Sequence, residues 1–175
     1  MKKMTSAYAN KLLRQLNEDK EYFLSKEDAS ATYVVAVGEE PIIPEYDYRE
    51  TADILAAIDK KVQIIKHAIN TANLTSTITV GEEELSIDVV LIRLAQLNRR
   101  KMTLDYMRKH LPRERYRMGR YESMRQSHSN TPEYECINYD LDLVKAEFEK
   151  ISDEIMQMQI ALDRHNQTFE FEVDI

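Results

Sequence analysis

The clearest pattern in the chain is an apolar repeat near its C-terminal end. Apolar side chains recur there at alternating intervals of three and four residues, at Leu141, Val144, Phe148, Ile151, Ile155, Met158 and Leu162. This spacing is typical of a helix that turns one narrow apolar stripe toward a partner helix, as in a coiled coil. It predicts a helix over residues 140–167, with the stripe from Val144 to Leu162 as a subunit interface or a core seam.

Three more helices are predicted from the same kind of periodicity. Residues 47–73 repeat the spacing of three and four at Leu55, Ile58, Val62, Ile65, Ile69 and Ala72. Residues 5–27 and 86–111 have less regular apolar stripes. Ser86 can cap the start of the latter helix, because its hydroxyl can accept a free backbone N–H, and Pro112 is expected to end it.

Short β elements are predicted in four places. Residues 31–37 are rich in β-branched and aromatic side chains, residues 77–85 flank Gly81 like a small hairpin, and residues 134–139 are expected to be extended. Residues 169–175 alternate apolar and acidic side chains, which is the period of a half-buried strand. We expect this tail to pair with the hairpin, because a lone strand cannot satisfy its backbone groups.

Together these elements predict a mainly α fold: an up-down four-helix bundle with coiled-coil-like seams and small β elements at both ends. The length of 175 residues suits a single helical domain over residues 1–175. Three glycines and four prolines supply too little turn material for a many-stranded sandwich or barrel. Apolar residues (43%) and charged residues (31%) are balanced, as in a globular chain.

The sequence also indicates a compartment. Its longest apolar runs are a few residues, far short of the roughly 20 residues that a membrane-spanning helix needs. The basic start of the chain is not followed by the apolar region of a signal peptide. The single cysteine, Cys136, cannot form an intrachain disulfide, which fits a reducing cytosol. We therefore expect a cytoplasmic protein without membrane contacts.

Charge is distributed unevenly along the chain. The net charge is −7, yet residues 93–125 contain eleven Lys and Arg against three acidic residues. The basic segment 99–125 is interleaved with tyrosines, a composition typical of nucleic-acid surfaces, where cations contact phosphates and rings stack on bases. The candidate contacts are Arg99, Arg100, Lys101, Arg113, Arg115 and Arg117.

The alternative for the basic segment is neutralisation within the protein. An up-down bundle places this segment at the same end as a group of acidic residues. They are Glu27, Asp28, Glu39, Glu40, Glu45, Asp47 and Glu50. We favour neutralisation, because these acids nearly cancel the positive charge, and we expect a second copy of the chain or another protein as partner before nucleic acid.

Motifs of catalysis and of cofactor binding are missing from the sequence. A di-iron bundle needs Glu-x-x-His, and none of the four histidines has a glutamate three residues upstream. Three scattered glycines cannot build a phosphate-binding loop. We expect no metal and no cofactor, and we favour a role other than catalysis. Asn70, Asn73 and Arg93 make a candidate polar site, although the two asparagines share a helix face where they could simply cap the last carbonyls.

Four landmarks resemble the septicolysin-like family of small bacterial helical proteins. They are Gly-Glu-Glu-Pro at 38–41, Ile-Asn-Thr-Ala-Asn at 69–73, a hairpin that leads into a helix with Asp88 and Arg93, and His-Asn-Gln-Thr at 165–168. The chain departs from the family pattern at Gln167, where the family has a tryptophan. The resemblance implies a helical, oligomeric fold and no established activity. We thus predict a homo-oligomeric scaffold or protein-interaction module of unknown biochemical role, with a nucleic-acid-binding module as the alternative.

Overall fold

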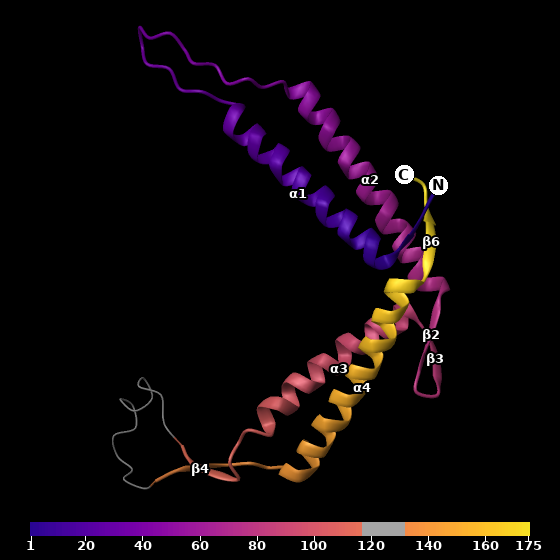
Figure 1. Ribbon diagram of the computed structural model, residues 1–175. Helices are drawn as coiled ribbons and strands as arrows, with labels where there is room; N and C mark the ends of the chain where they lie inside the picture. Colours follow the sequence, from indigo (N-terminus) through magenta and orange to yellow (C-terminus); the bar gives the residue numbers. More distant parts are fainter. Residues whose placement is uncertain (117–131) are drawn as a thin grey trace. The chain divides into compact units, whose positions relative to one another are not determined.

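The computed structural model describes residues 1–116 and 132–175 (Figure 1). These residues form four α-helices and three two-stranded antiparallel sheets. The predicted mainly α fold, with four helices and small β elements, is therefore confirmed. The chain divides into two compact units, one of Met1–Val89 with Ile160–Ile175 and one of Val90–Gln159. The grouping of all four helices in a single domain stays a prediction.

The helices lie close to their predicted ranges. They are α1 (Ser6–Ser30), α2 (Tyr48–Thr75), α3 (Ile87–Met107) and α4 (Leu141–Thr168). Thr5 and Asp47 cap α1 and α2, because each side chain accepts a hydrogen bond from a free N–H of the first helical turn. Helix α3 ends earlier than expected, since the N–H groups of the residues that follow Arg108 bond carbonyls only three residues back and tighten the chain into a turn before Pro112.

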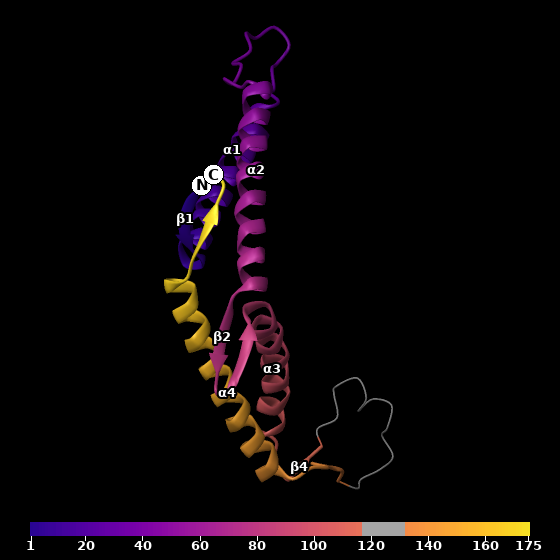
Figure 2. The same cartoon turned by 90° about the vertical axis from the view of Figure 1, so that its right-hand side faces the viewer.

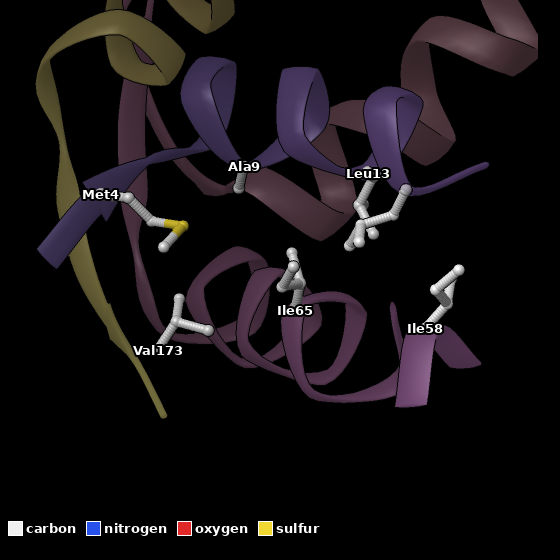
Figure 3. Close-up of a cluster of buried hydrophobic side chains, with 7 residues drawn as sticks. Met4, Ala9, Leu13, Ile58, Ile65 and Val173 are labelled. Carbon is white, nitrogen blue, oxygen red and sulfur yellow. The ribbon is translucent and has the colours of Figure 1, made fainter. Parts of the chain in front are cut away.

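In the first unit α1 and α2 lie side by side (Figures 1 and 2). Their facing sides form one hydrophobic core, to which both ends of the chain contribute. The buried residues of this core are Met4, Ala9, Leu13, Leu16, Ile58, Ile65 and Val173. Figure 3 shows how the labelled side chains, all of these except Leu16, gather between the two helices and the two terminal strands. Ile58 and Ile65 belong to the apolar stripe that predicted α2, so this stripe faces α1.

The C-terminal tail forms strand β6 (Glu170–Val173), as its alternating pattern predicts. Its expected pairing with the hairpin at 77–85 is wrong, because β6 pairs antiparallel with β1 (Lys2–Thr5). Strands β2 and β3 pair with each other, and β6 satisfies one row of its backbone groups by pairing with β1. The pairing also sets Met4 opposite Phe171, on the face that closes the hydrophobic core of the first unit.

The hairpin itself is confirmed. Strand β2 (Thr77–Val80) pairs antiparallel with β3 (Glu83–Ser86). Gly81 lies in the connecting turn with a φ of +63°, a conformation that glycine adopts without steric cost. The Ser86 hydroxyl then accepts a hydrogen bond from the N–H of Val89, as expected for the residue that caps α3.

The predicted strand at 31–37 is wrong. These residues belong to the segment between α1 and α2, and they pair with no strand in the part of the chain that the structure describes. Their β-branched side chains favour an extended backbone, but a strand also needs a neighbour with which to share hydrogen bonds. The described chain supplies no such neighbour at this end of α1 and α2.

In the second unit α3 and α4 lie side by side (Figures 1 and 2). The Arg93 Nη2 atom lies 2.6 Å from Glu154 Oε1, which joins the two helices by an ion pair. The hydroxyl of Tyr139 donates a 2.7 Å hydrogen bond to the carbonyl of Met107 and so ties the start of α4 to the end of α3.

A two-stranded sheet lies beyond the ends of these helices. Strand β4 (Arg113–Arg115) pairs antiparallel with β5 (Tyr134–Cys136). The extended conformation expected at 134–139 is thus confirmed for its first three residues. The sequence does not predict β4, because Arg-Glu-Arg has no apolar position and gives no alternating pattern.

Candidate interaction surfaces

The apolar stripe of α4 is covered within the chain. Its buried residues are Val144, Ile151, Ile155 and Met158, and its half-buried residues are Phe148 and Leu162. In the second unit α3 turns its own buried residues, Val90, Leu94 and Leu104, to the interior. A second copy could reach this part of the stripe only by displacing α3. The burial fits a core seam, and the use of the stripe as a subunit interface stays a prediction.

Two positively charged side chains lie over the ring of Phe148, the aromatic residue of this stripe. The guanidinium carbon of Arg108 lies 4.0 Å from the centroid of the Phe148 ring, and Lys101 Nζ lies 5.4 Å from it. A cation over a ring face is attracted by the negative face of the π-system. Lys101, a candidate contact for nucleic acid, is therefore held against α4 in the structure.

The candidate polar site is not brought together by any described contact. Arg93 pairs with Glu154, whereas Asn70 and Asn73 lie on α2 in the first unit. The side chains of the two asparagines make no hydrogen bond with the described residues. The hydroxyls of Thr75 and Ser76 bond the carbonyls of Thr71 and Ala72 in the last turn of α2, and the expected capping role of the asparagines stays a prediction.

The basic segment is partly neutralised by local partners. Asp105 pairs with Lys109 and with Arg108 Nη2, the latter at 2.7 Å, and hydrogen bonds from these two side chains lower the pKa of its carboxyl group. Arg99 and Arg100 are exposed on α3. Expected neutralisation by the acids of residues 27–50 stays a prediction, since those acids belong to the other unit.

The remaining candidate arginines lie on or after β4. Arg113 and Arg115 are exposed, and the guanidinium carbon of Arg113 lies 3.9 Å from the centroid of the Tyr134 ring. Arg117 lies outside the described residues. The β4–β5 register sets Arg115 opposite Tyr134 and Glu114 opposite Glu135. Because neighbouring residues of a strand face opposite sides, one face of this sheet carries arginine and tyrosine and the other carries glutamate.

A serine–histidine contact in the first unit has the wrong geometry for catalysis. The Ser76 hydroxyl oxygen lies 3.2 Å from His165 Nε2, but the hydroxyl donates a 2.6 Å hydrogen bond to the Ala72 carbonyl. With the serine proton used there, we assign the proton of the neutral histidine to Nε2, which donates to the serine oxygen. A nucleophilic serine needs the reverse arrangement, with the histidine as acceptor. The contact fixes the end of α4 against the end of α2.

The segment between α1 and α2, residues 31–47, is a surface that the sequence patterns do not single out. We call it the connector loop. Val34, Val37 and Ile42 are 99%, 107% and 91% exposed. Tyr33, Val35 and Ile43 are 49%, 48% and 65% exposed. In the sequence this loop is a run of β-branched residues followed by two prolines, which predicts a strand and gives no sign that the side chains are exposed.

The connector loop is attached to α1 by a polar contact. The hydroxyl of Tyr46 donates a 2.5 Å hydrogen bond to Glu27 Oε1. This bond, together with partial burial and the negative charge of the carboxylate, raises the pKa of Tyr46 to about 12. The base of the loop is therefore held in place while its apolar residues face outward.

The described residues offer neither a metal centre nor a membrane span. No group of three or more His, Cys, Asp or Glu in residues 1–116 and 132–175 could hold a metal ion. Within the same ranges, no helix is both long and apolar enough to cross a bilayer.

Comparison with known proteins supports the fold. No protein-family model and no curated protein matches the chain. Among solved structures, it is similar to the crystal structure of a functionally unknown conserved protein from Corynebacterium diphtheriae. The TM-score is 0.67 at 15% identity, over 98% of this chain and 100% of that chain. At this identity the likeness shows the fold alone.

Proposed function

We propose that the protein is a helical scaffold that assembles as a homo-oligomer in the cytoplasm. The observation that carries this proposal is the exposure of the connector loop. Six of its large hydrophobic side chains are 48% exposed or more: Tyr33, Val34, Val35, Val37, Ile42 and Ile43. Soluble proteins rarely leave so many contiguous apolar side chains in water unless a partner covers them.

The energetic reason is the size of the hydrophobic effect. Full burial of a valine or isoleucine side chain contributes about 1.5–3 kcal/mol. Val34, Val37 and Ile42 alone therefore offer roughly 4.5–9 kcal/mol to an association that buries them. The exposed thiol of Cys136 is compatible with a reducing compartment such as the cytoplasm. The resemblance to the septicolysin-like family, which implies an oligomer, stays a prediction.

The experiment is a measurement of molar mass in solution. Light scattering of the wild-type protein at tens of micromolar should give an oligomer. Replacing Val34, Val37 and Ile42 together by Asp should give a monomer with an unchanged helix signal, because these side chains support no core. The control is Leu74→Asp, which places one such charge on an exposed apolar residue outside the connector loop (65% exposed). A monomeric wild-type protein would contradict the proposal.

The second candidate function is nucleic-acid binding through the basic segment. It is favoured by the exposure of Arg99, Arg100 and Arg115 and by the ring of Tyr134 beside Arg113. We place it second because Lys101, Arg108 and Lys109 are already engaged within the protein.

A further inference from the structure

We propose that the connector loop of one copy docks on the arginine–tyrosine face of the β4–β5 sheet of a second copy. We call this face, with Arg113, Arg115 and Tyr134, the receiving face. The inference rests on the proposed homo-oligomeric function and names the surface that covers the loop. It follows from the charge and the apolar area of the two surfaces.

The connector loop is acidic as well as apolar. Residues 31–47 contain Glu39, Glu40, Glu45 and Asp47 and neither lysine nor arginine. Asp47 is used to cap α2, and Glu39 and Glu40 are exposed between Val37 and Ile42 in the sequence. A surface that covers this loop should therefore offer both positive charge and apolar area.

The receiving face has both properties. Arg113 and Arg115 are exposed, and neither has an ion pair with any residue that the structure describes. Tyr134, beneath the guanidinium of Arg113, is 47% exposed and gives an aromatic surface beside the two charges. Arginine with an aromatic ring is the composition that subunit and protein interfaces favour.

Other coverings of the loop are less favourable. Two connector loops placed against each other would bring glutamates of both copies together, and like charges in contact are destabilising. An anionic membrane surface would repel the loop for the same reason. A second copy provides opposite charge, and it does so with a surface that every copy carries.

The available area is sufficient for a stable interface. Six largely exposed side chains of this size offer on the order of 500 Å² of apolar surface. If two copies dock reciprocally, two loops and two receiving faces together bury roughly 2,000 Å², within the range of specific interfaces. A single contact would bury about half of that and would give a weaker assembly.

Charge reversal tests the pairing directly. In one variant Glu39 and Glu40 become Arg, and in the other Arg113 and Arg115 become Glu. Each variant alone should self-associate at least about tenfold more weakly than the wild type, because its loop and its receiving face then have the same sign. Mixed in equal amounts they should form a hetero-oligomer, since each copy then meets a surface of opposite sign. The measurement is sedimentation velocity with one variant fluorescently labelled.

The control and the outcomes separate this inference from the proposed function. Glu18→Arg with Glu21→Arg reverses two exposed acids of α1 and should leave assembly unchanged. A monomeric wild type overturns both proposals. An oligomer that the Asp variant of the loop breaks but that charge reversal leaves intact supports the proposed function and overturns this pairing. Weakening by each variant without rescue on mixing also overturns it, because a contact within one chain behaves in that way.

Discussion

At the scale of single residues, His165 is a group whose protonation should affect stability near neutral pH. Burial lowers its pKa from the usual value of 6.5, because the charged form loses hydration. The ring also stacks on Phe169, with centroids 4.6 Å apart, and its Nε2 contacts Ser76. The neutral ring is thus the form that the folded protein prefers.

The sign of the effect follows from proton linkage. Between the lowered pKa and about 6.5 the unfolded chain binds more protons at His165 than the folded chain does. Stability should therefore be complete above about pH 6.5 and should fall as the pH decreases toward the lowered pKa. We expect the thermal midpoint, followed by circular dichroism, to be lower at an acidic pH of about 5.5 than at about 7.5.

A comparison of variants tests whether His165 causes this change of the thermal midpoint with pH. His165→Gln should reduce the dependence of the midpoint on pH over this range. His67→Gln, which changes an exposed histidine of α2, is the matched control. Equal slopes in the wild type and in the His165 variant would contradict the assignment.

At the scale of secondary-structure elements, local patterns predict the four helices and the strands β2, β3, β5 and β6, but they do not predict β1 or β4. The stripes of α2 and α4 are visible in the sequence because one side of each helix packs in a core along much of its length. Strand β1 has Met4 as its only large apolar residue, and β4 has none. Both depend on a distant partner strand, which local patterns do not encode.

The candidate surfaces also combine features that the sequence predicts with features that depend on tertiary contacts. The arginines are visible in the sequence as a charged block, but the contacts of Arg108 with Phe148 and of Arg113 with Tyr134 depend on how α3, α4 and β5 meet. The connector loop has the composition of a strand, which explains why the sequence predicts one there. Its significance follows only from the exposure of Val34 and Val37, which no local pattern reveals.

Two isoleucines of α4 test whether its stripe holds the second unit together. Ile155 is 4% exposed and Ile160 is 63% exposed. Ile155→Lys should lower the free energy of unfolding by on the order of 3 kcal/mol, because it buries a charge without a partner. Ile160→Lys should change it by less than about 0.5 kcal/mol, as is usual for surface substitutions. Urea denaturation of both variants measures the difference.

The dependence of this loss of stability on protein concentration shows whether the stripe packs within one chain or between chains. If the stripe serves the interior of each chain, Ile155→Lys should destabilise the protein equally at low and at high protein concentration. A loss of stability that occurs only at concentrations where the wild type is assembled would instead assign the stripe to a subunit interface.

At the scale of the whole molecule, the uneven charge distribution favours contacts between copies over contacts with nucleic acid. The net charge is −7, so the field far from the surface repels phosphate backbones. Positive charge is concentrated between residues 93 and 125, and acidic residues dominate elsewhere. Such a molecule meets a surface of opposite sign on every other copy of itself.

Nucleic-acid binding should therefore be negligible. In a gel-shift assay at physiological salt we expect dissociation constants for duplex DNA and single-stranded RNA weaker than about 100 μM, the weak end of non-specific binding. The matched variant replaces Arg113, Arg115 and Arg117 by Ser. A micromolar complex that weakens steeply with salt and is lost in this variant would reverse the order of the two functions, because counterion release from phosphates would then outweigh the repulsion by the net negative charge. If instead the arginines receive the connector loop, the same triple variant should lower the oligomer mass and leave the nucleic-acid lanes unchanged.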